Sequence, residues 1–441
     1  MIEHSARLLN GLPKIGWGAA IALLALVAGC QSTDNSANLD GDTQSGTQGA
    51  AAGPLKIGTL LPITGDLAQY GGPMQDSASL LVETVNACGG VLGQPVEIVS
   101  EDSQTEPSAG ASAMTKLAEV DNVGGVVGAA ASSISGAAVD IAVRNSVVQI
   151  SPASTSPVFT ERAKNGDFSG YWFRTAPPDT FQGDALAQLA RDRGFDTVSI
   201  LAINNDYGNG LVESFSSAFE AQGGTVANGA PTLYTPDAAT FDSEVSAAFS
   251  GEPDALLLIA YPETGSLILK SAFEQGVLDG PIQIMLTDGM KDDAIAELVG
   301  QTASGEYIVS GAFGTAPSSE GPALDRFVQL YQDSFSREPS VFDPNTWDAA
   351  ALIVLAAEAA QSGMGKDIQV NVSEVANAPG QPVSDVCEGL ALLQEGEDID
   401  YQGASGVVDL DDQGDVVGSY EVWSIGADGG IEVEETVTVG G

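Results

Sequence analysis

The stretch "VGGVVGAAASSISGAAVDIAVRNSVVQISPAS", residues 123–154, indicates the fold of this chain. Its two apolar runs, "VGGVVGA" and "VVQIS", are short and nearly continuous, as is typical of strands buried on both faces of a parallel sheet. Between them, "ISGAAVDIAVRN" has the length and apolar spacing of a helix. A strand, a helix and a strand in this order predict a parallel sheet covered by helices.

The same alternation extends on both sides of this stretch. It begins with a strand in "LKIGTLLPITG" at residue 55 and is interrupted by the Pro-rich "RTAPPDTF" near residue 175. It then restarts with the segments "TVSILAINND", "GNGLVESFSSAFEAQG", "DALLLIAYPE", "TGSLILKSAFEQG" and "PIQIMLTDG". We therefore predict an α/β fold of two doubly wound parallel-sheet lobes with a cleft between them.

The first 54 residues read as a leader and a tether. Arg7 and Lys14 precede the apolar run "IGWGAAIALLALVAG", which has signal-peptide proportions and ends in "LVAGC", similar to the lipobox of bacterial lipoproteins. This predicts a signal peptide over 1–29 and a lipid on Cys30; the alternative is a plain signal peptide with an incidental cysteine. Residues 30–54 lack aromatic side chains and predict a flexible tether. We expect an exported protein, lipid-anchored to the outer face of the cell membrane.

The charge of the chain is strongly acidic. It has 60 Asp and Glu against 15 Lys and Arg, a net charge of -45, spread along the sequence. Such a surface repels nucleic acid and anionic membrane faces, so we exclude both as binding partners of the folded part. Few basic residues on a densely acidic surface suggest a salt-rich, halophilic environment, where screening weakens the self-repulsion.

The sequence lacks the residues that several catalytic and metal-binding functions require. The only histidine, His4, lies in the leader, so the mature chain has no Ser-His-Asp triad and no histidine metal ligand. No CxxC, Walker or GxGxxG motif at a strand-to-helix turn occurs. The acidic "DLDDQGD" at 409–415 resembles a calcium loop, but its twelfth position is Tyr420 rather than Glu. We expect no enzymatic activity, no metal and no cofactor.

Two turns rich in small residues favour ligand binding instead. Ser132 and Ser133 follow one predicted strand, and "SPAST" at 151–155 follows the next. Ligands of open parallel sheets bind beyond the carboxyl ends of the strands, where helix N–H groups and serine hydroxyls favour an anionic group. The alternative, tight turns in which serine merely caps a helix, fits the spacing equally well.

The order of several motifs resembles one known family. From about residue 55 to 425 the chain is similar to the type I periplasmic binding proteins of branched-chain amino acid ABC transporters. The motifs that carry this resemblance are "TGDLAQYG", "NACGGVLGQPVEIV", "GAAASS", "ISPASTSP", "NDYGNG" and "DIDYQGASGVVDLDDQGD". The resemblance implies a monomer that captures an amino acid, or an amide or urea as in some branches, between two lobes and delivers it to an ABC permease.

The same resemblance assigns candidate ligand contacts. Asp288 falls on the acid that receives the ligand ammonium, where valine- and leucine-binding members carry glutamate, and Ala131 replaces a cysteine next to the carboxylate-binding Ser132. The full candidate set is Tyr70, Ser132, Ser133, Ala153, Ser154, Thr155, Tyr207, Tyr261 and Asp288. Alternatively, the tyrosines are ordinary half-buried side chains and Asp288 caps a helix.

The resemblance also sets the domain boundaries and the place of the cysteines. It implies a first lobe of 55–176 plus 312–405, a second lobe of 177–311 plus 406–441, and crossings near Thr175, Ser310 and Gly406 that act as a hinge. With Cys30 lipidated, Cys88 and Cys387 remain, in one lobe and an oxidising compartment. We predict a disulfide between them; the alternative is two free buried thiols.

Four functions are compatible with the sequence. We favour a solute receptor for a transporter, and the second candidate is a ligand-sensing module of the same fold. An enzyme is disfavoured because no nucleophile and base pair is visible. A structural cell-surface lipoprotein would show no closure on a ligand.

Overall fold

The computed structural model describes residues 54–438, so the predicted leader (1–29), Cys30 and the tether up to residue 53 lie outside the described residues. The first sheet has five parallel strands in the order β2–β1–β3–β4–β5. The bounds of its strands are β1 (Lys56–Leu61), β2 (Glu97–Asp102), β3 (Gly125–Gly128), β4 (Val148–Ser151) and β5 (Trp172–Arg174).

Helices cover both faces of this sheet. Neighbouring residues of β3 point to opposite faces: Val126 packs in the cluster that contains Met114 and Ile134, and Val127 packs in the cluster that contains Leu81 and Ile353. This explains the continuous apolar runs of the strands. The helices that connect the strands are α1 (Ala68–Ala87), α2 (Pro107–Lys116), α3 (Ser132–Asn145) and α4 (Val158–Lys164).

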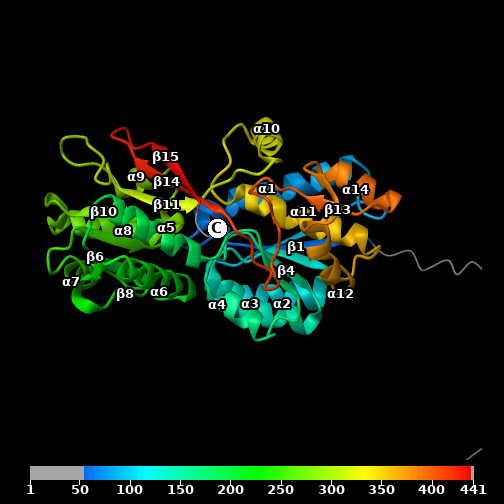
Figure 1. Ribbon diagram of the computed structural model, residues 1–441, viewed down its shortest axis with the longest axis horizontal. Helices are drawn as coiled ribbons and strands as arrows, with labels where there is room; N and C mark the ends of the chain where they lie inside the picture. The colour runs from blue at the N-terminus through cyan, green and yellow to red at the C-terminus, as the bar shows by residue number, and fades with distance from the viewer. Residues whose placement is uncertain (1–53, 439–441) are drawn as a thin grey trace, which may run out of the picture. The chain divides into compact units, whose positions relative to one another are not determined.

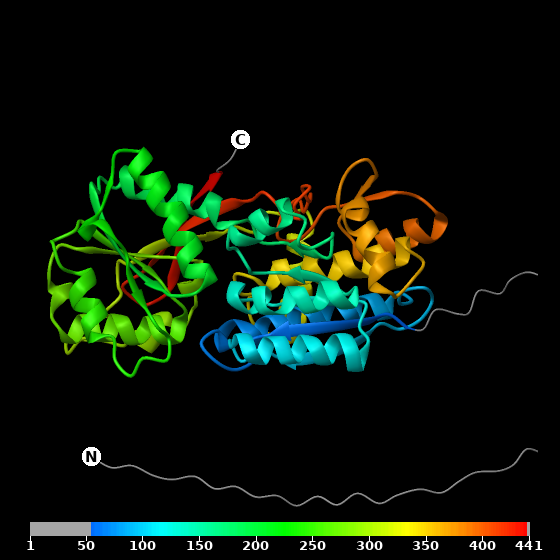
Figure 2. The ribbon, with the colours of Figure 1, turned by 90° about the horizontal axis from the view of Figure 1, so that it is seen from below.

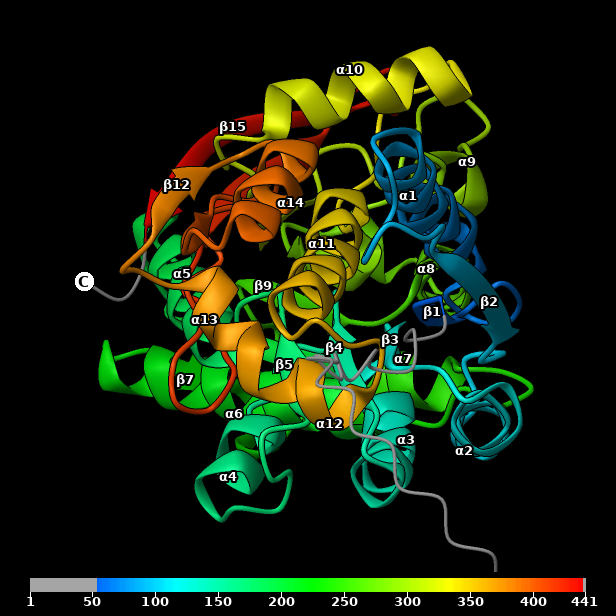
Figure 3. The same ribbon diagram turned by 90° about the vertical axis from the view of Figure 1, so that its right-hand side faces the viewer.

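A later segment completes the first lobe, by which we mean the first sheet and the elements packed on it. The helix α11 (Asp343–Ala359) is buried along almost its whole length and contacts α1, α13 and α14 (Figure 3). Its sequence is apolar on all sides because neighbours surround it. The other elements are α10 (Leu324–Phe335), α12 (Gly365–Ile368), α13 (Val372–Ala376), β12 (Gln381–Val383), α14 (Val386–Glu395) and β13 (Ile399–Tyr401).

The second lobe is built on an eight-stranded sheet with the order β15–β14–β11–β10–β9–β6–β7, with β8 also pairing with β6. Helices lie on both of its faces (Figure 2). Its strands are β6 (Thr197–Ile203), β7 (Thr225–Val226), β8 (Thr232–Tyr234), β9 (Ala255–Ile259), β10 (Gln283–Leu286), β11 (Phe313–Pro317), β14 (Ser419–Ile425) and β15 (Ile431–Thr438). Its helices are α5 (Asp179–Asp192), α6 (Asp206–Ala221), α7 (Asp242–Ala248), α8 (Pro262–Glu274) and α9 (Ile295–Val299).

The α/β fold class predicted from the sequence is confirmed, but two of the expected crossings lie elsewhere. The segment after residue 312 was placed in the first lobe, whereas β11 pairs with β10 and β14 of the second sheet, so this crossing follows Pro317 (Figure 1). The crossing expected at Gly406 also comes later, because Leu410 and Val416 pack in the core of the first lobe before β14 begins. In addition, β14 and β15 run antiparallel, which was not predicted.

A disulfide joins two helices of the first lobe. Cys88, at the end of α1, is bonded to Cys387 of α14, with the two Cα atoms 6.0 Å apart, within the range usual for such bonds. Both residues lie in the lobe in which the resemblance placed them. Within residues 54–438, no helix combines the length and apolar character that crossing a bilayer requires.

Candidate functional site

A cavity lies between the two lobes, beyond the carboxyl ends of strands from both sheets. Six of the nine candidate residues line it: Tyr70, Ser132, Ala153, Tyr207, Tyr261 and Asp288. Six further lining residues were not predicted: Leu67, Met74, Ala130, Ala131, Gly289 and Phe342. Its free volume is about 20 Å³, room for roughly one water molecule. A larger ligand must therefore displace flexible side chains or hold the lobes slightly further apart.

One end of the cavity is the first turn of α3. This helix begins at Ser132, so the two serines that were expected in the preceding turn are its first residues. The Ser132 hydroxyl oxygen accepts a hydrogen bond from the Ser156 N–H (3.3 Å), which leaves its own O–H free to donate. The first N–H groups of the helix have no acceptor within it. This end of the cavity therefore offers donors to an anionic group. Ser133 is half-buried and does not line the cavity.

The turn after β4 packs against the turn before α3 and, apart from Ala153, does not line the cavity. The Ser154 hydroxyl lies within hydrogen-bond distance of the Ala129 and Ala130 carbonyls (3.2 and 3.0 Å) and of the Ser135 hydroxyl (2.8 Å), so it ties the two turns together. Thr155 is fully buried, and its carbonyl accepts the N–H of Asp179 (2.8 Å). Ala153 alone of this predicted trio borders the cavity.

A buried arginine holds the same turn from behind. Arg174 forms an ion pair with Asp415 (2.6 Å) and donates to the carbonyl oxygens of Ser154 and Ser156 (3.1 and 3.0 Å). Its side chain is fully buried, and its donors are directed at the protein rather than at the cavity. Asp415 belongs to the acidic stretch 409–415, which thus supplies a structural ion pair. No cluster of acids, cysteines or histidines within residues 54–438 is arranged to hold a metal ion.

The second lobe contributes a buried carboxylate to the other side of the cavity. Asp288 is 3% exposed, and its carboxylate accepts a hydrogen bond from the Tyr207 hydroxyl (2.7 Å), which in turn lies 2.8 Å from the Thr287 hydroxyl. Burial raises the pKa of Asp288 to about 6, and the Tyr207 hydroxyl opposes that rise. None of the lysines or arginines that the structure describes forms an ion pair with it. Such a carboxylate is stabilised by a cationic group.

Aromatic and aliphatic side chains form the remaining walls. The rings of Tyr207 and Tyr261 stack at 5.6 Å, and Tyr70 meets Phe342 edge-on at 6.1 Å. The Tyr70 hydroxyl donates to the Asp288 carbonyl across the cleft (3.3 Å). Leu67, Met74 and Phe342 complete an apolar wall. Leu67 lies within the motif "TGDLAQYG", but all three look like core residues in the sequence and were not predicted.

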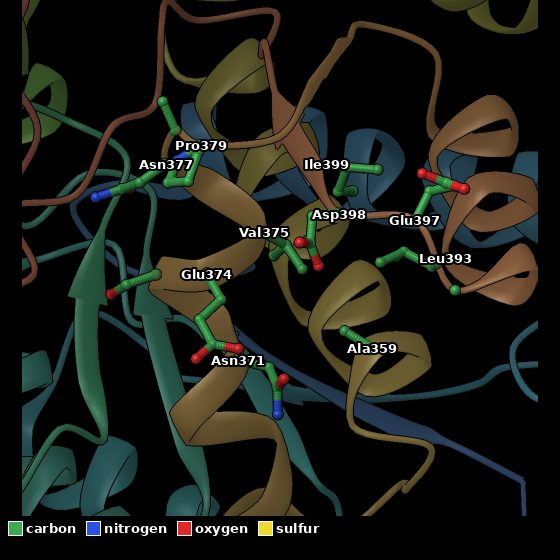
Figure 4. Close-up of a pocket in the computed structure, with 13 residues that line it drawn as sticks. Ala359, Asn371, Glu374, Val375, Asn377, Pro379, Leu393, Glu397, Asp398 and Ile399 are labelled. Carbon is green, nitrogen blue, oxygen red and sulfur yellow. The ribbon is translucent and has the colours of Figure 1, made fainter.

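A larger hollow in the first lobe lacks this kind of organisation. It has a volume of about 680 Å³ and lies among α11, α13 and β13 (Figure 4). Its acids Glu374, Glu397 and Asp398 are exposed, and the amide of Asn377 is engaged with the backbone of Leu410. Exposed acids are ordinary on a chain this acidic, so we regard the interlobe cavity as the functional site.

Comparison with known proteins agrees with this fold. The family model described as the receptor family ligand binding region matches residues 74–428. The chain belongs to this family. Its two α/β lobes make it a type I periplasmic binding protein, as the leucine-binding protein LivK from Thermotoga maritima shows: the TM-score is 0.73 at 25% identity, covering 87% of this chain and 99% of LivK.

Two relatives of this binding protein illustrate its similarity to known proteins. The chemotactic signal transduction system substrate-binding protein BasB of Halobacterium salinarum is 26% identical over 419 residues, which is 88% of this chain and 91% of BasB. The Leu/Ile/Val-binding protein homolog 1 of Brucella abortus is 27% identical over 334 residues, 74% of this chain and 84% of the relative. One relative is thus named for a chemotactic system and the other for Leu/Ile/Val binding.

Proposed function

We propose that this binding protein captures an α-amino acid with a small aliphatic side chain in the interlobe cleft. The observation that carries the proposal is the pairing of opposite chemistries: Asp288 at one end and the first turn of α3 with Ser132 at the other. Asp288 would receive the ammonium, and the α3 donors the carboxylate. The wall formed by Leu67, Met74 and Phe342 suits an aliphatic side chain better than an amide or urea.

We further propose that the protein is exported, anchored through Cys30, and delivers its ligand to an ABC permease. The leader and lipobox in the sequence and the Leu/Ile/Val-binding relatives support this reading. The second candidate is a sensory role, in which the same closed form is read by a chemotaxis receptor; it is favoured by the likeness to BasB over most of the chain. Both roles use the same ligand site.

A thermal-shift panel tests the ligand class. The mature chain without the lipid should gain thermal stability with leucine, isoleucine or valine, because a ligand that binds only the folded state raises the melting temperature. Urea, simple amides and aromatic carboxylates without an ammonium group should give no shift. A shift with an aromatic carboxylate and none with any amino acid would contradict the proposal.

Closure of the two lobes can be tested by a substitution at a contact between them that lies outside the ligand cavity. Gly210 of α6 faces the first lobe, and a Cβ atom at this position would lie 2.7 Å from Pro157 Cδ and 2.9 Å from Ser156 Oγ. We expect Gly210→Ala to disfavour the closed arrangement by about 1–3 kcal/mol, lowering ligand affinity roughly 5- to 150-fold. The matched control is Gly72→Ala, also in a helix, where a Cβ meets nothing within 4 Å. Equal affinities of the two variants would show that this contact plays no part in binding.

The acidic surface predicts a response to salt. If the excess of acids is an adaptation to a saline habitat, the melting temperature should rise steadily between 0.1 and 2 M KCl, because the Debye length falls to about 3 Å at 1 M and repulsion among the acids weakens. Thermal unfolding followed by circular dichroism would measure this. A melting temperature that stays flat over this range would count against a halophilic origin.

A further inference from the structure

Asp179 is a buried carboxylate beside the ligand site that the proposed ligand contacts do not use. It is the first residue of α5 and is fully buried, and its backbone N–H donates to the Thr155 carbonyl. Neither of its carboxylate oxygens has a hydrogen-bond partner within the part of the chain that the structure describes. An ionised carboxylate removed from water needs donors or a positive charge to stay ionised.

The positive charge near Asp179 belongs to Arg174, which already forms an ion pair with Asp415. Arg174 is the cation that faces Asp179, and its attraction opposes protonation. However, its guanidinium donates to the Asp415 carboxylate, the Thr160 hydroxyl and two carbonyl oxygens of the turn after β4. Asp415 neutralises it at 2.6 Å. Arg174 therefore supplies Asp179 with a weak field and no hydrogen bond.

The tyrosines that face Asp179 are also engaged. Tyr207 donates to Asp288 at 2.7 Å, and Tyr420 of β14 donates to the Pro178 carbonyl at 3.3 Å. Tyr261, at the start of α8, accepts a hydrogen bond from the Asn205 amide at 3.2 Å. The Tyr207 and Tyr420 hydroxyls are thus directed at other groups, and the Tyr261 hydroxyl makes no hydrogen bond to the Asp179 carboxylate.

The remaining polar atoms near Asp179 are mostly acceptors. Gln182, one turn further along α5, directs its amide N–H groups at the Thr315 carbonyl and hydroxyl (3.0 and 3.3 Å), and its amide oxygen is buried without a partner. The Thr155 hydroxyl is the side-chain donor that lowers the pKa of Asp179. Apart from it, the Asp179 carboxylate oxygens and the Gln182 amide oxygen are buried acceptors without a hydrogen-bond partner among the described residues.

The charge of Asp288 further disfavours the ionised form of Asp179. Burial, followed by the charge of Asp288, raises the pKa of Asp179 well above its usual value, while the Thr155 hydroxyl and Arg174 lower it. The Asp179 N–H donates to the Thr155 carbonyl of the first lobe, so opening of the lobes would part this contact and admit water to the carboxylate, and hydration favours the ionised form. The protonation state of Asp179 would then depend on whether the cleft is closed.

We propose that closure of the cleft around its ligand takes up one proton at Asp179. This inference rests on the amino-acid binding proposed above. The protonated acid leaves Asp288 as the single free negative charge opposite the ligand ammonium, and its O–H supplies a donor to these buried acceptors. The bound cleft is then electrically balanced: Asp415 pairs with Arg174, Asp288 with the ammonium, and the α3 donors with the ligand carboxylate.

The proposal fixes the direction of the pH effect. Because Asp179 binds its proton more tightly in the closed form than in the open form, ligand affinity should fall as the pH rises. Taken alone, Asp179 leaves the affinity unreduced below the ordinary aspartate pKa of about 4. The ammonium also requires ionised Asp288, whose pKa is about 6, so the slope is measured above that value. There the affinity falls up to about tenfold per pH unit until the pH passes the raised pKa of the closed form.

Titration calorimetry in buffers of different ionisation enthalpy measures the proton directly. The full mature chain is titrated with leucine at pH 7.5 in phosphate and in Tris, a pH at which Asp288 is already ionised. We expect a net uptake of protons, at most about one per ligand, by the wild type and none by Asp179→Asn. Asp184→Asn, an exposed acid on the same helix, is the matched control and should retain the uptake.

The outcomes separate this inference from the function on which it rests. Saturable heat that is the same in both buffers would overturn the inference and leave amino acid binding intact. Proton uptake that persists in Asp179→Asn would overturn the assignment to this residue. No saturable heat with leucine, isoleucine or valine would contradict the proposed function, and the inference with it. The slope of wild-type affinity against pH provides a second measurement that needs no variant.

Discussion

Asp288→Asn should weaken amino acid binding by about 2–5 kcal/mol, which is roughly a thirtyfold to several-thousandfold rise in Kd. The reason is that the ligand ammonium would lose its buried carboxylate, while the Tyr207 hydroxyl that now donates to Asp288 would still fit the amide oxygen of asparagine. Calorimetric titration with leucine, isoleucine and valine measures the effect.

Two comparison variants make this result specific. Asp293→Asn removes an exposed acid five residues further along and should leave Kd unchanged. Ser132→Ala should cost less than Asp288→Asn, about 1–2 kcal/mol, because the N–H groups of α3 remain. Unchanged affinity in Asp288→Asn would refute the assignment of the ammonium site.

Removal of the disulfide by Cys88→Ser with Cys387→Ser should lower the stability of the chain by about 4–5 kcal/mol, because the bond closes a very long loop in the unfolded chain. The two residues are 299 apart in sequence. We expect the melting temperature of the double variant to fall by roughly 5 °C. Ligand affinity should change little, since both cysteines lie in the first lobe and neither lines the cleft.

The bond itself can be checked before any mutagenesis. Mass spectrometry of the unreduced, alkylated chain should find no modified thiol at Cys88 or Cys387. Two alkylated thiols would contradict the disulfide, and a double variant as stable as the wild type would contradict its energetic role.

Most of the fold could be predicted because each strand and helix is indicated by the pattern of its own residues. Each buried strand and amphipathic helix has its own periodicity, so the alternation from residue 55 onward is visible without any long-range information. The crossings were placed less well. The apolar run that contains β11 fits either sheet, and only its pairing with β10 and β14 places it in the second. Strand pairing between distant segments leaves no local mark in the sequence.

The site residues likewise include some that could be predicted from the sequence and some that could not. The turns after β3 and β4 could be predicted because parallel strands bring their carboxyl ends to one edge. Tyr70, Tyr207, Tyr261 and Asp288 were proposed through the family resemblance, and the structure places all four at the cavity. Ser154 and Thr155 fall behind it, because a hydroxyl that ties two turns together has the same sequence context as one that faces a ligand.

Other residues near the site carry no signal in the sequence. An apolar side chain such as Phe342 has the same sequence pattern whether it faces a cavity or the core. Asp179 in "PPDTF" reads as an ordinary acid at a helix start; its burial beside a second carboxylate is a property of the fold alone.

The central claim is that the cleft recognises the two charged ends of an amino acid together. A titration of the wild-type chain with leucine and with two analogues, one lacking the ammonium group and one lacking the carboxylate, tests it most directly. We expect saturable binding of leucine and no measurable binding of either analogue at the same concentrations. Binding of either analogue as tightly as leucine, or failure of leucine, isoleucine and valine alike to bind, would contradict it.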